Sequence, residues 1–272
     1  MTTLTANPSA PDTDQALFRA HHGLVQIVAL LWVYALYDEL RSHVAGATAK
    51  ASQHARALFG VERTLGLNLE RGIQSAALHL PWLVAACNVS YNSLHLVAPP
   101  IVLVMLYRRA PQRYRHWRNV FVIMLGLAAL CFWLYPVMPP RLVTGTGHLL
   151  DTSTVYFSLT KTPLASLVSA TASSGPSVTG STNPYAAMPS LHVGWAIWAA
   201  IALWPLLRRR WAKAALLLYP TLMVLAVLVT ANHWVLDAIG GAVLVLLSHT
   251  LARAVERCQA TVGLSRESPV PA

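Results

Sequence analysis

Long apolar runs separated by short polar segments dominate the chain. Each run approaches the roughly 20 residues that an α-helix needs to cross a bilayer. The first and shortest covers residues 23–37, and the second lies in the charge-free segment 72–107, at 81–106. The other four runs are residues 119–138, 189–207, 214–231 and 233–252. The pattern predicts an all-α, polytopic membrane protein built as a six-transmembrane-helix bundle.

The polar segments between these runs predict the rest of the organisation. Apolar and charged residues mix within 51–78, so we expect a short amphipathic helical segment between spans 1 and 2, on the membrane surface or capping the bundle. Residues 141–188 are expected to form an extramembrane loop. The predicted division is a polar N-terminal tail over 1–20, a six-span membrane catalytic domain over 21–255 and a cytoplasmic C-terminal tail over 256–272.

Composition supports the membrane class and excludes several others. Only 11% of the residues are charged and 55% are hydrophobic, whereas soluble domains carry about 25% charged residues. The net charge of +10 comes from basic residues between apolar runs, without an aromatic-interleaved patch, so nucleic acid is not an expected partner. The three cysteines, Cys87, Cys131 and Cys258, give neither a disulfide framework nor metal-ligand spacing.

Basic loops predict the orientation. Positively charged residues flanking spans remain on the cytoplasmic side of a membrane. With six spans, the three basic groups share one side, so both termini are predicted inside a cell (cytoplasmic) membrane. The groups are Arg108, Arg109, Arg113, Arg115 and Arg118 after span two, Arg208, Arg209, Arg210 and Lys213 after span four, and Arg253 and Arg257 after span six. Residues 40–80 hold five more basic residues on the other side, a weaker counter-signal over a longer segment.

An ionisable pair, His233 and Asp237, interrupts the last apolar stretch. An aspartate inside a span costs at least about 2.5–3.5 kcal/mol on insertion scales, so a chain retains such a group for its chemistry. A spacing of four places both side chains on one helix face, where a carboxylate can orient an imidazole. Topology places the pair at the outer end of its span, where solvation costs less.

Two other segments reach the same outer face. Pro139 and Pro140 end span three and should project Arg141, a planar donor fork suited to phosphate oxygens. Pro189 and Ser190 are typical of a helix start, here that of span four on the same side, so its free amides favour an anion and His192 lies in its first turn. Two histidines permit two roles, one attacking phosphorus and the other protonating the departing oxygen. A lone histidine is more often structural, so His79, His95, His148 and His249 receive no role.

The stretches Pro-Pro-Arg, Pro-Ser-Leu-His and His-Trp-Val-Leu-Asp resemble the motifs of the phosphatidic acid phosphatase type 2 superfamily. More narrowly, they resemble its inositolphosphotransferase branch, which includes inositol phosphorylceramide synthases. The resemblance implies that His233 is a nucleophile forming a phosphohistidine, oriented by Asp237, with His192 as the general acid. It implies that Arg141 and Ser190 hold the phosphoryl oxygens, with no metal and no cofactor.

Some family positions differ. The phosphatase pattern has a lysine where this chain has Leu134, a proline at Leu142, a glycine at Leu191 and an arginine at Val227. Two cations of the usual phosphate clamp are therefore missing, and these losses fit the transferase branch better than a simple phosphatase. Arg56, Arg63 and Lys161 are the candidates to replace these two cations.

The expected function is an integral-membrane lipid-phosphate phosphotransferase or phosphatase with its site facing outside, and transfer is slightly favoured. Its expected partners are a lipid phosphate in the bilayer and a polyol or lipid alcohol acceptor. One alternative is a simple lipid-phosphate phosphatase acting on a polyprenyl phosphate or phosphatidate. An alternative of another class is a non-catalytic membrane protein that only binds a lipid phosphate.

Overall fold

The computed structural model describes residues 25, 26, 28–37, 39, 48–144, 149–152 and 185–266, with side chains described to residue 261. Within these ranges the chain is helical and forms no β-strand, and one isolated bridge pairs Val137 with Ala186. This confirms the predicted all-α class. Residues 145–148 and 153–184 of the expected extramembrane loop lie outside the described ranges, as do Lys161 and His148.

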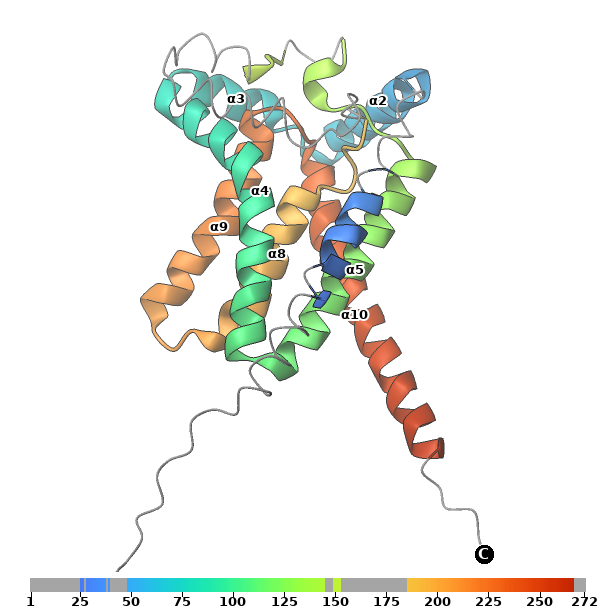
Figure 1. Ribbon diagram of the computed structural model, residues 1–272. Helices are drawn as coiled ribbons and strands as arrows, with labels where there is room; N and C mark the ends of the chain where they lie inside the picture. The colour runs from blue at the N-terminus through green and yellow to red at the C-terminus, as the bar shows by residue number, and fades with distance from the viewer. Residues whose placement is uncertain are drawn as a thin grey trace, which may run out of the picture.

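The α-helices from α2 to α10 are labelled in Figure 1, and the 3-10 helices η2 and η3 lie between them in the chain. They are α2 (Thr48–Leu65), α3 (Glu70–Leu78), α4 (Pro81–Arg109), α5 (Pro111–Leu134), η2 (Pro140–Leu142), α8 (Leu191–Leu203), η3 (Trp204–Leu206), α9 (Arg210–Val229) and α10 (Val235–Arg266). The predicted amphipathic segment therefore forms two helices, α2 and α3. The predicted C-terminal tail begins inside α10.

Four helices in the described part of the chain are long and apolar enough to cross a membrane: Pro81–Arg109, Pro111–Leu134, Arg210–Val229 and Val235–Thr261. The first and fourth predicted runs correspond to shorter apolar helices, Val28–Tyr37 and Leu191–Leu206. By length and composition the chain is thus a multi-pass membrane protein, while the count of six spans stays a prediction.

Prolines set several of the helix boundaries. Pro81 and Pro111 occupy first-turn positions of α4 and α5, where the missing N–H costs nothing and the fixed φ suits a helix. Span three was predicted to run from 119 to 138, but α5 begins at Pro111 and ends at Leu134, just before Pro136. Pro139 and Pro140 therefore do not end span three as expected, and Pro140 begins the 3-10 turn η2, which contains Arg141.

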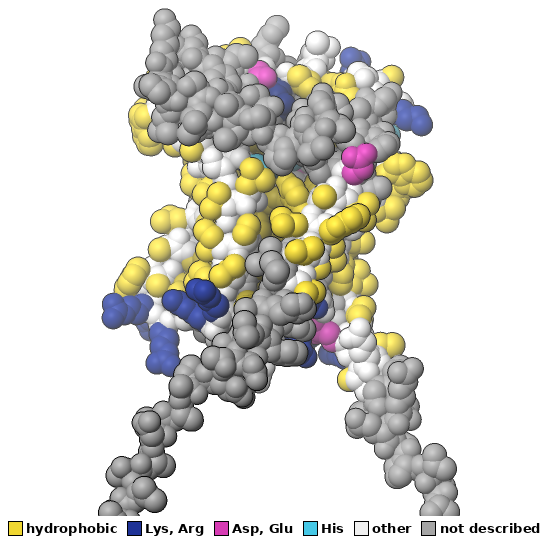
Figure 2. Space-filling view, viewed as in Figure 1, with side chains coloured by type: hydrophobic (Ala, Val, Ile, Leu, Met, Phe, Trp, Pro, Cys, Tyr) yellow, Lys and Arg dark blue, Asp and Glu magenta, His cyan; other side chains and the backbone are white. Residues whose placement is uncertain are grey.

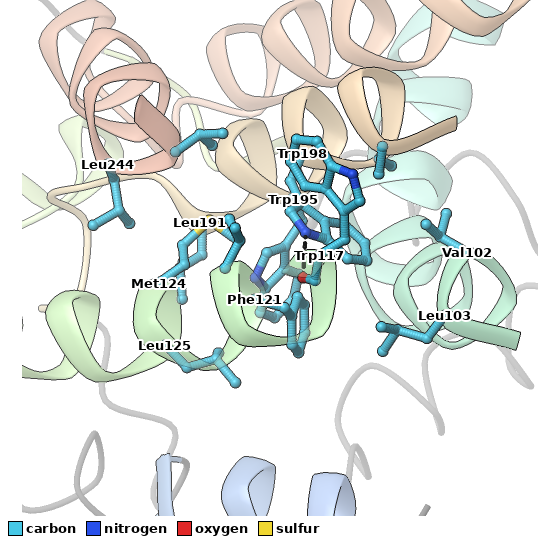
Figure 3. Packing of buried hydrophobic residues seen from close by; sticks show 14 of the residues in the cluster. Val102, Leu103, Trp117, Phe121, Met124, Leu125, Leu191, Trp195, Trp198 and Leu244 are labelled. Carbon is cyan, nitrogen blue, oxygen red and sulfur yellow. Dashed lines mark hydrogen bonds between the residues drawn. The ribbon is translucent and has the colours of Figure 1, made fainter. Parts of the chain in front are cut away.

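The centre of the bundle is α8, which contacts α4, α5, α9 and α10. Most of its side chains are buried. Figure 3 shows the indole of Trp198 between α8 and α5, with its Nε1 donating to the carbonyl oxygen of Trp117 at 3.0 Å. Because lipid tails are as apolar as leucine, such helices associate through close packing and interhelical hydrogen bonds. The short α8 is therefore held by its neighbours on several sides.

The two ends of the bundle differ in charge. The α4–α5 junction, the α8–α9 junction and the far end of α10 lie at one end, and α2, α3 and the α9–α10 connection lie at the other (Figure 1). Figure 2 shows dark-blue Lys and Arg side chains at both ends, and the three basic groups of the sequence lie at the first end, below a band of hydrophobic side chains. We call these the basic end and the site end. The candidate site residues that were predicted from the sequence lie at the second end, which is why we call it the site end.

Candidate active site

A tight turn between α9 and α10 carries His233. The Ala231 N–H donates to Leu228 O at 3.0 Å and the Asn232 N–H to Val227 O at 3.1 Å, which is the Schellman pattern of a helix end. That pattern places its C′ residue in left-handed backbone, and here Ala231 takes φ +49° where glycine is usual. The N–H of His233 also points at Val227 O, at 3.4 Å.

His233 precedes α10, which begins at Val235, so the expected alignment of His233 and Asp237 along one helix face is wrong in its geometry. The two side chains nevertheless meet, with His233 Nδ1 3.5 Å from Asp237 Oδ2. The same Nδ1 lies 2.8 Å from the carbonyl oxygen of Ala187. Because a carbonyl oxygen only accepts, Nδ1 carries the proton and the lone pair resides on Nε2. This tautomer suits a nucleophile.

Asp237 is completely buried and binds backbone on two sides. Its Oδ2 accepts the N–H of Trp234 at 2.9 Å, and its main-chain oxygen accepts the N–H of Ser190 at 2.9 Å. The carboxylate is thereby fixed at the start of its own helix, where the helix dipole favours a negative charge. The second bond links this helix start to that of α8.

Glycines allow the two helix starts to approach. A Cβ added to Gly241 would lie 2.3 Å from the main-chain oxygen of Ser190, and one added to Gly194 would lie 3.3 Å from Gly241 O. Only a residue without a side chain fits at Gly241. The pair Gly240-Gly241 therefore brings the beginning of α8 against α10.

Ser190 is the N-cap residue of α8, yet its side chain makes no capping hydrogen bond. It is fully buried. Ser190 therefore does not cap α8 through its side chain, and its hydroxyl is available to a ligand. As expected, His192 lies in the first turn of α8.

Two aromatic side chains of α4, which sequence reasoning left without a role, complete the surroundings of His192. The His192 ring stacks on Tyr91 with centroids 4.1 Å apart, and His95 meets it edge-on at 4.7 Å. The rings of His192 and His233 are 5.5 Å apart. The signal lay in the polar face Asn88, Tyr91 and His95, at helical spacing inside an apolar span. Sequence reasoning had treated His95 as structural.

Arg141 lies beside the same turn. Its backbone N–H donates to Ala231 O at 3.1 Å, and its Nη1 donates to Asn232 Oδ1. Its Nε faces Asp151 Oδ2 at 3.4 Å. The guanidinium of Arg141 therefore lies next to the turn that precedes His233, as predicted. It also contacts the carboxylate of Asp151, which was not predicted.

The segment that carries Asp151 is fastened to α3 and α4. The buried Gln74 accepts the N–H of Leu150 at 2.8 Å and donates to Leu150 O at 2.9 Å and Val229 O at 3.0 Å. Asn88 donates to Thr152 Oγ1 at 3.2 Å. These bonds keep residues 149–152 over the site end.

The buried polar atoms of this site include His233 Nε2, Ser190 Oγ and Asp237 Oδ1, which have no hydrogen-bond partner among the residues that the structure describes. Buried polar groups are almost always paired, so unpaired ones indicate a missing ligand or water. The Ser190 hydroxyl and the His233 imidazole suit a phosphoryl group as ligand. The hydroxyl can donate a hydrogen bond to a phosphoryl oxygen, and the imidazole nitrogen can attack phosphorus through its lone pair.

Among the described residues, which do not include Lys161, no replacement for the two missing clamp cations is seen. Leu134 is 62% exposed at the end of α5, and Val227 is fully buried in α9. Arg56 and Arg63 are both exposed on α2. No group of three His, Cys, Asp or Glu that could hold a metal ion occurs among the described residues.

Comparison with known proteins gives one match. The model of a family described as the PAP2 superfamily matches residues 56–251, from α2 to α10. The match therefore includes all five residues proposed from the motifs. No curated protein and no solved structure matches the chain.

Proposed function

Because the chain belongs to the PAP2 superfamily, we propose that it is a metal-independent enzyme that cleaves a lipid phosphoester through a phosphohistidine on His233. The main support for the proposal is the hydrogen bonding of the His233 imidazole. Its Nδ1–H is fixed by Ala187 O at 2.8 Å, and its Nε2 is buried without a partner among the described residues. A fixed tautomer with a free lone pair is what a nitrogen nucleophile requires.

In the proposed reaction His233 Nε2 attacks phosphorus, and an N–P bond forms as the P–O bond to the leaving group breaks. His192 donates its proton to the departing oxygen. Asp237 stabilises the positive charge that develops on the His233 ring, at 3.5 Å from Nδ1. The acceptor oxygen then attacks phosphorus, returns a proton to His192 and releases His233.

Arg141, Ser190 Oγ and the free amides of α8 are proposed to hold the phosphoryl oxygens. A helix N-terminus and a guanidinium both favour a phosphate, the first through its N–H groups and dipole and the second through its planar donors. Transfer to a polyol or lipid alcohol is favoured over hydrolysis. Two features support this choice: the missing clamp cations and the burial of His233, which is only 4% exposed.

A trapping experiment tests the intermediate. Wild-type protein in detergent, quenched during turnover of a ³²P-labelled lipid phosphate, should give an acid-labile, base-stable phosphoprotein that His233→Ala does not give. Product analysis with and without a polyol acceptor then separates transfer from hydrolysis. Tight binding of lipid phosphates without turnover or phosphoprotein would instead favour the non-catalytic alternative.

The proposed orientation places the site end outside the cytoplasmic membrane and both termini inside, because the basic end carries the three basic groups. Cys258 is exposed near the basic end, whereas Cys87 is buried. A membrane-impermeant maleimide should label Cys258 in inside-out vesicles and spare it in intact cells, with Cys258→Ser as the control. Labelling in intact cells alone would reverse the orientation.

A further inference from the structure

Carboxyl oxygens accept three successive backbone N–H groups at the start of α10. The Trp234 N–H donates to Asp237 Oδ2 at 2.9 Å, that of Val235 to Glu70 Oε1 at 2.9 Å and that of Leu236 to Glu62 Oε1 at 2.7 Å. The first N–H groups of a helix have no partner within it, and the dipole favours negative charge there. The two glutamates come from α2 and α3, more than 160 residues earlier in the chain.

This arrangement is an expensive way to cap a helix. Glu62 is fully buried and Glu70 is 2% exposed, and a buried carboxyl group costs several kcal/mol unless it is well paired or protonated. A serine or aspartate just before the helix would cap it locally at little cost. The chain instead uses His233 and Trp234 at that position, so the caps must come from elsewhere.

Helix α2 also holds the Trp234 side chain. Its indole packs against Phe59 of α2 with centroids 5.8 Å apart, and its Nε1 donates to Met138 O at 3.0 Å. The N–H of Met138 in turn donates to Ala51 O of α2 at 3.1 Å. The backbone and the side chain on the C-terminal side of His233 are therefore both held by the segment that forms α2 and α3.

We infer that Glu62 and Glu70 are positioning residues of the active site, which clamp the first turn of α10 and so hold the backbone of His233 and the carboxylate of Asp237. Neither glutamate touches the reacting atoms. The catalytic consequence rests on the function proposed above. In this arrangement α2 and α3 are parts of the active site as well as a cover for the bundle.

The charge state of Glu62 makes the clamp sensitive to pH. Burial raises the pKa of Glu62 from 4.5 to about 8, against the lowering effect of the Leu236 N–H, and Glu70 of α3 and Asp237 of α10 add to the rise. Glu62 is then mostly neutral at pH 7, which spares the site another negative charge beside those two carboxyl groups. Ionisation would introduce repulsion at the helix start.

Because folding raises the pKa of Glu62, the stability of the folded protein depends on pH. The folded protein retains a proton that the unfolded chain releases near pH 4.5. The stabilisation from this proton is complete below that pH and is lost as the pH rises through about 8. Both the melting temperature and the turnover of the wild type should therefore decline on the alkaline side.

The test uses full-length protein in detergent and the variants Glu62→Gln, Glu62→Ala and Glu70→Gln, with Glu256→Gln as a matched control at the basic end. Two properties are measured from pH 5.5 to 9.5: turnover of a lipid phosphate, and hydrogen exchange of the Trp234–Asp237 amides by mass spectrometry. The exchange measurement does not depend on the proposed reaction.

Glutamine keeps the acceptor oxygen and cannot ionise. Glu62→Gln should therefore retain neutral-pH activity and amide protection but lose the alkaline decline. Glu62→Ala should lose kcat by roughly 10- to 100-fold with little change in KM, because a displaced nucleophile reacts slowly, and its Val235 and Leu236 amides should exchange faster. Glu70→Gln should leave Val235 protected, because its amide oxygen also accepts, and Glu256→Gln should match the wild type throughout.

Wild-type kcat and amide protection in Glu62→Ala would overturn the inference. So would an unchanged alkaline decline in Glu62→Gln, which remains decisive if the alanine variant does not fold. If the wild type shows no turnover on any lipid phosphate, the proposed function fails. Faster exchange of the Leu236 amide in Glu62→Ala than in the wild type and Glu62→Gln then still decides whether the clamp exists.

Discussion

Each end of the bundle carries a histidine pair with a carboxylate, and the two clusters differ in what their polar atoms contact. At the basic end His116 Nδ1 lies 3.0 Å from both oxygens of Glu256, and its Nε2 lies 3.0 Å from His249 Nδ1. Both ring nitrogens of the central histidine are thus engaged by the protein. At the site end, His233 Nε2 has no partner among the described residues.

The difference also extends to solvent exposure. The His116 and Glu256 side chains are 19% and 36% exposed, whereas those of His233 and Asp237 are 5% and 0% exposed. A partly solvated pair that satisfies its own hydrogen bonds is a structural tie between α5 and α10. A buried group with an unpaired lone pair requires another explanation, and ligand binding provides it. Residue type alone therefore does not identify the catalytic cluster.

Removal of the central histidine at each end should give the largest difference between the two clusters. His233→Ala should lower kcat by at least about 10³-fold, because it removes the attacking atom. His116→Ala should keep turnover within roughly 3-fold of the wild type, because it removes a partly exposed tie. Steady-state turnover of a lipid phosphate measures both. Equal losses in both variants would remove the distinction between the ends.

Removing the proposed proton donor should give the next largest effect. His192→Ala should lose about 10²–10⁴-fold in kcat on an alkyl phosphoester, the usual contribution of a general acid. On a nitrophenyl phosphoester the loss should be much smaller, because nitrophenolate leaves without a proton. An equal loss on both substrates would mean that His192 does not protonate the leaving group.

The close approach of α8 and α10 can be tested with one methyl group. Gly241→Ala places a Cβ 2.3 Å from Ser190 O, so the start of α8 must move, and a displacement of about 1 Å can cost 10²-fold in rate. Gly126→Ala is the matched control, because its Cβ would meet nothing within 4 Å. Turnover with thermal unfolding distinguishes misplacement from a general loss of stability. Wild-type turnover in Gly241→Ala would contradict the geometry.

The contact between Arg141 and Asp151, at 3.4 Å, predicts a smaller effect of opposite sign. A lipid phosphate must compete with the Asp151 carboxylate for the guanidinium. Asp151→Asn should therefore lower KM, by up to about 5-fold, since partly exposed ion pairs contribute at most about 1 kcal/mol. A raised KM would show instead that Asp151 helps to bind the substrate.

The smallest effect is expected at the basic end. Glu256→Gln weakens the contact with His116 and should lower the free energy of unfolding by less than about 1 kcal/mol, with no change in turnover. Thermal unfolding in detergent measures the first and the lipid-phosphate assay the second. A large loss of turnover would mean that the basic end also serves the reaction.

Local sequence was sufficient to find the five motif residues, because each stands where an apolar run meets prolines or a polar cluster. Arg141, Ser190, His192, His233 and Asp237 come from three segments, and the count of apolar runs correctly placed all three at one end. The sequence did not predict that Tyr91 and His95 contact His192, because a polar face within a span does not reveal which helix it packs against. Packing of α4 against α8 decides that contact.

By itself the sequence determined the membrane class, the apolar runs and the separation of the basic loops from the ionisable motifs. These depend on hydropathy and charge, which act locally along the chain. Only the tertiary structure decided that His233 precedes its helix, that Ala187 fixes its tautomer and that Glu62 and Glu70 cap α10. Those features depend on contacts between distant segments, and the distance and direction of such contacts are not encoded in any single run of residues.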